Sequence, residues 1–387
     1  MNSKQDFLQE AKSVKIAIID HVGNKAGMDY YDCSLAKGLE KNECETFLFS
    51  NFLGRDTDKI KYHSVFEGHT KSNPLKKLFY LLRGVLQASY RAKKYEVDLV
   101  ILHLFYANAI TLILIAVPRL FGLKTLVVSH DVTSFVENDN KAIQQLIYNQ
   151  FSTYVVVHNH FSYNTLIKNI NINNIEKVKI IKQGGYIDLV NTNISKADAR
   201  RKMGLEEDQK YILFFGQIKK VKGLDILLEA MSNVSNDIKL IIAGKPLQDD
   251  MNFYNEIIKK HHLEDRVIQM IRFIEDEERE NLFLSADVNV LPYRIIYQSA
   301  VLLMAMSHGV AVIASDLPAN KEVITDQENG LLFVNENPKD LADKINLFFN
   351  TPNLKDTLSF NAKKTIEQSY SWDEIAKSYI EIVHNGV

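Results

Sequence analysis

The chain has 387 residues, of which 46% are hydrophobic and 24% are charged, and its formal net charge is -2. This length suits two domains with a core each, and the composition is that of a globular protein. A near-neutral charge argues against a general nucleic-acid binder, because no field of one sign covers the whole molecule. We therefore expect a folded two-domain protein with no nucleic-acid partner.

The cysteine content and the apolar runs bear on where the chain resides. Residues 1–13 show no signal-peptide pattern, so Cys33 and Cys44 are expected to be free thiols in a reducing cytosol. The longest apolar run, Ala109–Val117, is shorter than the roughly 18 residues that a membrane span needs, and Pro118 follows it. The sequence thus predicts a cytoplasmic chain that does not cross a bilayer.

Short β-rich runs alternate with helical patterns in the first half. Val14–Asp20 predicts a strand, His21–Met28 a glycine-containing loop and Tyr30–Lys41 a helix. Further strands are expected at Asp98–Leu104, Thr125–Ser129 and Tyr154–His158. Strands that alternate with helices predict a parallel sheet, with ligands at the carboxyl ends of its strands.

The segment 71–95 is basic and amphipathic. It contains no acidic residue, whereas lysine and arginine recur from Lys71 onward. Its apolar residues at helical spacing are Leu75, Leu78, Phe79, Leu82, Val85 and Leu86. Such a helix can lie on an anionic membrane surface, with Lys76, Lys77 and Arg83 facing the lipid. A helix that packs its apolar stripe on the first domain, with its lysines in water, fits the pattern equally well.

The alternation of strands and helices restarts after the polar stretch Asn191–Asp198, which predicts a linker. Strands are expected at Tyr211–Phe215, Ile238–Ala243, Val267–Ile271, Val288–Leu291 and Val310–Ala314. We predict an α/β fold of two doubly wound, Rossmann-like domains, 1–193 and 194–369, whose parallel sheets face a cleft.

The stretch Pro292–Ser315 places a helix N-terminus behind a loop of small and polar residues. The turn Tyr297–Ala300 precedes an apolar helix, Val301–Ser307, and His308-Gly309 ends that helix before the next strand. Free backbone N–H groups and the positive dipole end make such an N-terminus a site for phosphate or diphosphate. An ordinary loop–helix–strand unit of an α/β core has the same pattern.

Several segments, in order, resemble the family-4 glycosyltransferases, which have the GT-B architecture. In the second half they are Phe214–Asp225, Ala286–Pro292, Ala305–Ser315 and Glu322–Leu332. Val127–Asp131 is similar to the family's strand end at the acceptor side. Tyr370–Ala376 is similar to the family's closing helix, which implies that residues 370–387 form a helix returning to the first domain.

The resemblance implies a donor site for a UDP- or GDP-linked sugar in the second domain. Lys222, between a strand end and a helix, would neutralise the charge that grows on the leaving diphosphate. A surface lysine is the alternative interpretation. The residues expected to bind the donor are Gly216, Gln217, Lys222, Gln298, Ser299, Ala300 and Val301.

The chain also departs from the family pattern. Gln217 stands where the family usually has arginine, and Ile296 and Met304 stand where it has a pair of glutamates. Neither apolar side chain can accept a hydrogen bond from a sugar or ribose hydroxyl. The loop offers Gln298 and Ser299 instead, as in a subgroup with a similar Tyr-x-x-Ser-Gly loop. The donor base and the stereochemical outcome therefore stay open.

In the first domain, His130 is the candidate catalytic residue near the acceptor. It follows a predicted strand end beside Asp131, where it could orient or polarise a sugar hydroxyl. A capping or structural histidine is the alternative, and we expect His103 to be structural. Gly23 and Gly27 would let the acceptor-side loop approach the ligand closely. No cluster has metal-ligand spacing, and the family requires no metal.

The resemblance therefore implies a metal-independent glycosyltransferase without a cofactor, with retention of configuration as the family's usual outcome. Its acceptor would be a glycan on a polyprenyl lipid, as in cell-surface polysaccharide synthesis, at the inner face of the membrane. A catalytically silent partner of another transferase is the alternative, since the glutamate pair is missing. A nucleotide-sugar epimerase would need carboxylates that the matched segments do not supply.

Overall fold

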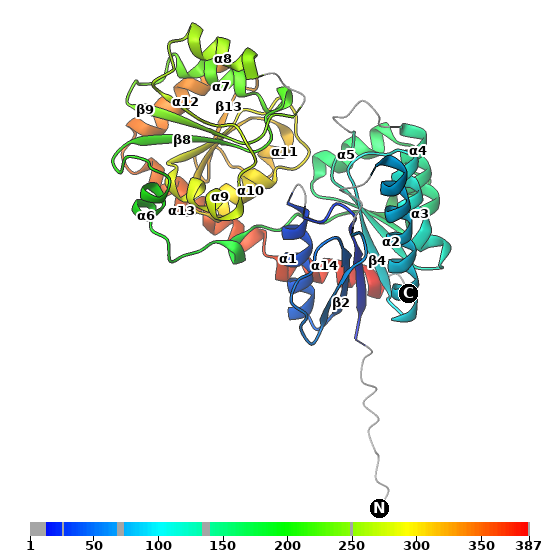
Figure 1. Ribbon diagram of the computed structural model, residues 1–387. Coiled ribbons are helices and arrows are strands. Elements are labelled where there is room, and N and C mark those ends of the chain that lie inside the picture. Colours follow the sequence, from blue (N-terminus) through cyan, green and yellow to red (C-terminus); the bar gives the residue numbers. More distant parts are fainter. Residues whose placement is uncertain (1–12, 25–26, 68–72, 134–139, 248–250, 386–387) are drawn as a thin grey trace, which may run out of the picture. The chain divides into compact units, whose positions relative to one another are not determined.

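The computed structural model describes residues 13–24, 27–67, 73–133, 140–247 and 251–385 (Figure 1). The chain divides into two compact units: residues 1–157, 163–181 and 372–387 form the first, and residues 158–162 and 182–371 form the second. The segment 1–12, used to predict the absence of a signal peptide, and Lys71 lie outside the described residues. Residues 193 and 194, between which the sequence predicts the domain boundary, both lie within the second unit.

The first unit is built on a seven-stranded parallel sheet with the order β3-β2-β1-β4-β5-β6-β7. The strands are β1 (Lys15–Ile19), β2 (Glu45–Ser50), β3 (Ile60–Ser64), β4 (Leu99–Leu104), β5 (Thr125–Ser129), β6 (Tyr154–Val157) and β7 (Val178–Ile180). The strand order reverses direction between β1 and β4. In open α/β sheets, ligands bind at the carboxyl ends of the strands beside such a reversal.

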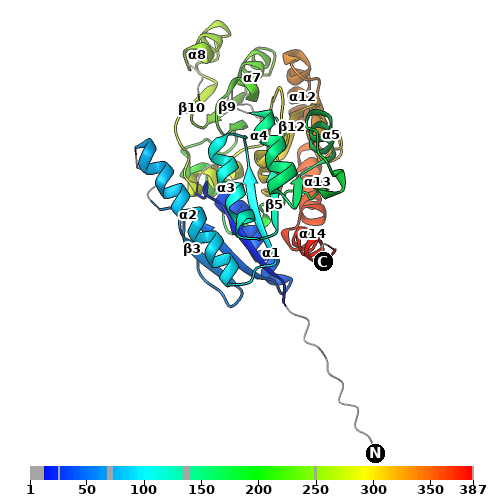
Figure 2. The ribbon, with the colours of Figure 1, turned by 90° about the vertical axis from the view of Figure 1, so that its right-hand side faces the viewer.

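Helices cover both faces of this sheet (Figures 1 and 2). On one face lie α2 (Pro74–Lys94), α3 (Ala109–Leu120) and α4 (Lys141–Leu146), and on the other α1 (Met28–Lys41) and α14 (Trp372–Asn385); α5 (His160–Asn169) follows β6. Because both faces are covered, β1 and β4 are nearly continuous apolar runs that are buried throughout their centres.

The second unit has a six-stranded parallel sheet with the order β10-β9-β8-β11-β12-β13. The strands are β8 (Lys210–Phe215), β9 (Ile238–Ala243), β10 (Val267–Met270), β11 (Val288–Leu291), β12 (Ala311–Ser315) and β13 (Leu331–Phe333). Here the order reverses between β8 and β11, so the loops after these two strands meet at the expected ligand position.

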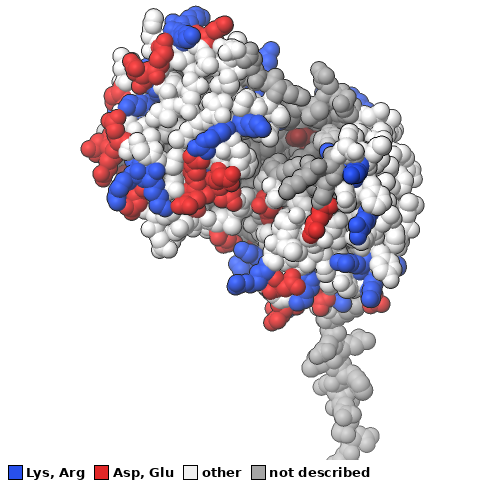
Figure 3. All heavy atoms as spheres, viewed as in Figure 1, with Lys and Arg blue, Asp and Glu red and all other residues white. Residues whose placement is uncertain are grey.

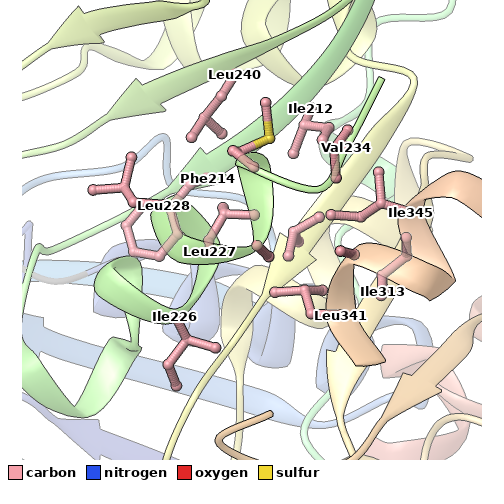
Figure 4. Packing of buried hydrophobic residues seen from close by; sticks show 14 of the residues in the cluster. Ile212, Phe214, Ile226, Leu227, Leu228, Val234, Leu240, Ile313, Leu341 and Ile345 are labelled. Atoms are coloured by element: carbon pink, nitrogen blue, oxygen red, sulfur yellow. The ribbon is translucent and has the colours of Figure 1, made fainter. Parts of the chain in front are cut away.

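The helices of the second unit also form two layers (Figure 1). One layer holds α7 (Leu224–Met231), α8 (Met251–Lys260) and α12 (Pro338–Asn350); the other holds α6 (Lys196–Lys202), α9 (Asp276–Ser285), α10 (Ala300–Ser307) and α13 (Leu354–Ser369), and α11 (Pro318–Lys321) follows β12. Figure 4 shows the core between the sheet and the first layer, where Phe214, Leu227 and Leu341 pack together.

The C-terminal helix α14 belongs to the first unit, as predicted. Trp372, Ala376 and Tyr379 are buried in the core of that unit against α1. At Gly38 of α1 a Cβ atom would lie 2.4 Å from the Trp372 carbonyl oxygen, so this close approach requires glycine. Cys33 and Cys44 are both free, in agreement with the prediction.

Among the described residues, no helix combines the length and the apolar character that crossing a membrane requires.

Candidate functional site

In the first unit, the loop after β1 is a tight turn at the carboxyl edge of the sheet. The Asp20 carboxylate accepts hydrogen bonds from the backbone N–H groups of Val22 (2.8 Å) and Gly23 (2.6 Å). Gly23 has a φ of 59°, and a Cβ atom there would lie 1.9 Å from the Asn51 Oδ1 atom. Gly27, with a φ of 76°, is the N-cap of α1. Both glycines predicted for the acceptor side thus lie in one loop.

His130 directly follows β5, and Asp131 comes next. The His130 backbone N–H donates to the Leu104 carbonyl oxygen at 2.9 Å, which ties it to the end of β4. Its half-buried ring stacks on Phe105, with centroids 4.5 Å apart and planes 8° apart. The predicted catalytic histidine therefore has a fixed ring plane at the carboxyl edge of the sheet.

A chain of hydrogen bonds links His130 to a buried carboxyl group. His130 Nε2 lies 2.9 Å from His103 Nδ1, and His103 Nε2 lies 2.9 Å from Asp32 Oδ1. His103 is on β4 and Asp32 on α1, and both side chains are almost fully buried. The sequence predicts only a structural role for His103 and carries no signal for Asp32. The pairing of β4 with β5 brings the two histidines together at the sheet edge.

Burial controls the ionisation of this cluster. Burial, with the neighbouring charge of Asp32, raises the pKa of Asp20 to about 7. Burial also raises the pKa of Asp32 well above its usual range, and a hydrogen bond with Asp20 opposes this rise. Burial lowers the pKa of His103 to about 4, despite the attraction of Asp20. His103 is therefore neutral near pH 7 and carries a single ring proton.

In the second unit, the loop after β8 packs against the end of β11. Gly223 has a φ of 67°, and a Cβ atom there would lie 1.9 Å from the Pro292 carbonyl oxygen. The Lys222 Nζ atom lies 3.7 Å from the centre of the Tyr293 ring, a cation–π contact. Gln217 is exposed in the same loop. The predicted donor cation is thus held at the strand-order reversal, next to the loop after β11.

Arg294 holds these two loops together. Its guanidinium donates to both carboxylate oxygens of Asp225, at 2.9 and 2.7 Å, and to the Lys220 carbonyl oxygen at 2.7 Å. Its backbone N–H also donates to the Val221 carbonyl oxygen. Since the charge of Arg294 is matched by Asp225, Lys222 is the better placed of the two to meet a phosphate.

The N-terminus of α10 lies beside the end of β8. Ser299 is its N-cap, and the buried Ser299 hydroxyl accepts from the Leu302 backbone N–H at 3.1 Å. The helix begins at Ala300, so the N–H groups of Ala300 and Val301 have no intrahelical acceptor. A Cβ atom on Gly216 would lie 3.6 Å from a Val301 methyl group. The structure thus brings Gly216, Ser299, Ala300 and Val301 together, and their binding of a donor stays a prediction.

The loop before α10 is hydrogen-bonded to a short segment, residues 158–162, whose role the sequence does not predict. The Asn159 side-chain amide donates to the Tyr297 carbonyl oxygen (2.5 Å) and to the Gln298 side chain (3.2 Å). Next to Asn159, the backbone N–H groups of residues 160 and 161 donate to the Glu322 carboxylate. Residues 158–162 belong to the second unit, so these contacts support the loop before α10 from within that unit.

Ile296 and Met304, at the positions of the family's glutamate pair, are both buried, with 8% and 9% of their surface exposed. They pack as core residues. Among the described residues, no group of three or more His, Cys, Asp or Glu side chains is arranged to hold a metal ion.

The apolar residues of α2 fall on two faces, and the single stripe predicted from the sequence is wrong. Leu81 and Val85 are buried against the first unit. Leu75, Phe79 and Leu86, together with Tyr90, are exposed, at 80%, 61%, 48% and 62%. Lys76, Lys77 and Arg83 are exposed too. The helix therefore packs one apolar face on the sheet and presents a second to its surroundings.

The second unit matches a known protein family. Residues 195–365 fit the family model described as "Glycosyl transferases group 1". An uncharacterized glycosyltransferase of Methanocaldococcus jannaschii is 29% identical over 212 residues, which are 54% of this chain and 54% of that protein. The chain spans about half the length of the curated relatives that it matches.

Solved structures share the fold over nearly the whole chain. Sucrose-phosphate synthase from Thermosynechococcus elongatus has a TM-score of 0.76 at 20% identity, covering 96% of this chain and 98% of that chain. HepE from Anabaena, in complex with UDP-glucose, has a TM-score of 0.74 at 18% identity, covering 96% and 99%. These likenesses confirm the predicted GT-B fold class. The subgroup without the glutamate pair stays a prediction.

Proposed function

We propose that the chain is a glycosyltransferase that moves a sugar from a nucleoside diphosphate to a glycan acceptor. The observation that carries the proposal is that Lys222 and the N-terminus of α10 both lie at the strand-order reversal of the second unit, Lys222 on Tyr293 after β11 and Val301 beside Gly216 after β8. A cation and free backbone N–H groups in one place suit a diphosphate. The group 1 domain match and the UDP-glucose held by HepE support the same interpretation.

On the donor side, these groups would stabilise the charge that develops on the leaving diphosphate. The contact of Lys222 with the Tyr293 ring is worth about 0.5–2 kcal/mol, less than a charge-assisted bond to phosphate in a dry site. Lys222 can therefore exchange the ring for a phosphate oxygen. Gln217 and Gln298 can supply further hydrogen bonds. We expect a UDP- or GDP-linked donor, transfer without a metal, and retention of configuration.

On the acceptor side, His130 would contact the hydroxyl that attacks the sugar, with Gly23, Gly27 and Asp131 in neighbouring loops. An imidazole within hydrogen-bond reach can orient that hydroxyl and take its proton. We expect the acceptor to be a glycan carried on a polyprenyl lipid, as in the synthesis of cell-surface polysaccharides.

Transfer can be tested with sugar nucleotides and lipid-linked glycans by detecting the released nucleoside diphosphate. Lys222→Ala should lower turnover by about 100-fold or more, the usual effect of losing one charge-stabilising donor. Lys220→Ala is the matched control, because the exposed Lys220 side chain carries the same charge two residues away. Donor binding without any turnover would favour the silent-partner alternative, and equal losses in both variants would contradict the role of Lys222.

We further propose that α2 docks the protein on an anionic membrane surface from the cytoplasmic side. Its exposed apolar residues lie at positions 75, 79, 86 and 90, with the half-buried Leu82 and with lysine and arginine between them. Elsewhere, basic and acidic side chains are interspersed, as the face drawn in Figure 3 shows. An apolar stripe flanked by cations is the pattern of an interfacial helix.

Sedimentation with lipid vesicles tests this membrane contact. Replacing Lys76, Lys77 and Arg83 by alanine should release the protein from vesicles that contain anionic lipid, and more so at high salt. The control replaces three exposed lysines of the second unit, Lys259, Lys260 and Lys339, and should bind as the wild type does. Unchanged binding of the first variant would contradict the proposal.

A further inference from the structure

We propose that Gln144 and Tyr148 are positioning residues that fix the loop carrying His130 and Asp131. The inference stands on four buried residues whose polar groups join this loop to the helical segment 140–151. It also rests on the proposed function, because His130 is the residue expected to meet the acceptor hydroxyl.

The four residues hold the loop from both flanks. On the N-terminal flank, the Ser129 hydroxyl lies 2.7 Å from the Tyr148 hydroxyl. On the C-terminal flank, the Val132 carbonyl oxygen accepts a hydrogen bond from the Gln144 side-chain amide at 2.8 Å. The same amide nitrogen also donates to the Tyr148 hydroxyl at 3.3 Å, so the contacts on the two flanks form one network. We call these four residues the polar clamp.

The helical segment that supplies two of the clamp's side chains is itself fixed at both ends. It passes from α4 into a π-helical turn, Ile147–Phe151, and such turns are frequent at functional sites. At its start, the Asn140 backbone N–H donates to the Ala107 carbonyl oxygen at 2.9 Å. At its end, the Thr125 hydroxyl donates to the Phe151 carbonyl oxygen at 2.6 Å. Because these anchors follow β4 and begin β5, the segment supports the loop from a fixed position.

Packing alone does not account for the polar side chains at these positions. Ser129, Gln144 and Tyr148 are 1%, 2% and 0% exposed. Burying a polar group costs free energy unless the group is hydrogen-bonded. The Gln144 Oε1 atom is buried and has no hydrogen-bond partner among the described residues. A methionine would fill the same space without that cost, so we assign the Gln144 amide the task of directing the backbone at Val132.

The polar clamp restricts where the His130 side chain can lie. The contacts of His130 with Phe105 and with the Leu104 carbonyl oxygen hold it from the side of β4. The clamp adds one fixed point directly before His130 and another two residues after it, which sets the course of the backbone through Asp131. A displacement of about 1 Å can cost about 100-fold in rate, so this support suits a residue that must meet a substrate hydroxyl.

Amide hydrogen exchange of the full-length protein tests whether the clamp fixes the loop. Gln144→Met removes the donor to Val132 and keeps the length of the side chain, whereas Tyr148→Phe removes the hydroxyl and keeps the ring. In each variant, the backbone amides of residues 130–132 should exchange about 10-fold faster than in the wild type, the factor for losing roughly one buried hydrogen bond.

Ser152→Ala is the matched control. It removes another buried hydroxyl, which donates to the Ile147 carbonyl oxygen at 2.9 Å in a bond that does not involve the loop, and it should leave exchange at residues 130–132 unchanged. In the transfer assay, both clamp variants should lower kcat about 10-fold and leave the nucleotide dissociation constant and the amount of nucleotide bound unchanged. A mere loss of folded protein would instead lower turnover and bound nucleotide by the same factor.

Unchanged exchange at residues 130–132 in a folded Gln144→Met or Tyr148→Phe protein would overturn the proposal, as would an equal acceleration in Ser152→Ala. Faster exchange with an unchanged kcat would overturn it too. So would a wild-type protein whose loop amides exchange at the rate of an unfolded chain, a result that needs no variant to fold. Failure of the proposed function shows separately, as a wild type that transfers no sugar, because the exchange measurement requires neither donor nor acceptor.

Discussion

A buried carboxylate, Asp287, joins four parts of the second unit, and removing its charge should destabilise that region. It accepts hydrogen bonds from Lys196 Nζ (2.6 Å), from Arg200 (3.0 Å) and from the Tyr211 backbone N–H (2.7 Å), and it contacts Lys355 as well. These partners lie on α6, β8 and α13, and Asp287 itself precedes β11. We therefore choose Asp287→Asn, which keeps the shape and deletes the charge.

The expected loss of stability follows from how deeply the charged groups of Asp287 and Arg200 are buried. The side chains of Arg200 and Asp287 are 6% and 7% exposed. Burial favours the neutral form of Asp287, but the cations, Lys196 first, outweigh it and hold the pKa of this carboxyl below its usual range. Burial lowers the pKa of Lys196 to about 8, so we assign the larger share of the pairing to Arg200, which cannot deprotonate. Breaking a buried pair costs about 3–5 kcal/mol.

Hydrogen exchange localises this effect without assuming two-state unfolding of the whole chain. In Asp287→Asn, amides of β8 and β11 should exchange roughly 100-fold faster, the factor for about 3 kcal/mol. Glu206→Gln, which breaks a 2.8 Å pair between Lys239 and a Glu206 side chain that is 71% exposed, should change protection by less than about 1 kcal/mol. Equal protection in the Asp287→Asn protein and the wild type would refute the reasoning.

Two further predictions concern a glycine and a buried acid. Gly223→Ala should abolish nucleotide binding and lower the unfolding temperature, because the new Cβ atom would meet the Pro292 carbonyl oxygen. Gly204→Ala is the control, because Gly204 has the same φ of 67° and no atom within 4 Å of an added Cβ. It should lower the free energy of unfolding by only about 1 kcal/mol. The pKa of Asp20 is raised to about 7 from 3.8, so the folded protein keeps a proton that the unfolded chain has lost, and this group makes stability fall as pH rises through that window. Asp20→Asn should therefore make the slope of the unfolding free energy against pH less negative by about 1.4 kcal/mol per pH unit between pH 4 and 7. Urea titrations at several pH values measure this slope. An unchanged slope would argue against the raised pKa of Asp20.

The sequence sufficed for the parts of the fold with a strong local signal. β4 and β9 are β-branched, apolar runs between helical patterns, and both lie where they were predicted. Of the four strands that the sequence analysis did not predict, β2 has six residues and is buried from its second residue onward, whereas the other three have weaker patterns. β3 is mostly half-exposed, and β7 and β13 have three residues each, too few for a period to be recognised.

The residues of the candidate donor site could be read from the sequence more easily than the contacts that support them. Gly216 and the α10 N-terminus could be predicted because each motif is contiguous in the chain. The support from Asn159 to Gln298 spans 139 residues, and the bond from the residue 161 backbone to Glu322 spans 161. A single sequence carries no signal for such a pairing.

The chain of hydrogen bonds from His130 through His103 to Asp32 shows the same limit. His103 and His130 each end a predicted strand, so the parallel pairing of β4 and β5 could have indicated that they meet. The contact of Asp32 with His103 could not be predicted in this way, because the position of α1 over the sheet depends on tertiary packing. In α2, likewise, helical spacing could not tell which apolar residues pack on the sheet and which stay exposed.

The most direct test of the central claim is a thermal-shift measurement of the purified protein with UDP, GDP, CMP, dTDP and NAD. A ligand at about 100 times its dissociation constant adds about 2.7 kcal/mol of stability. The account predicts a shift with one nucleoside diphosphate that Lys222→Ala abolishes and Lys220→Ala retains. No shift with any of these nucleotides, or a shift that survives in Lys222→Ala, would contradict the assignment of the donor site.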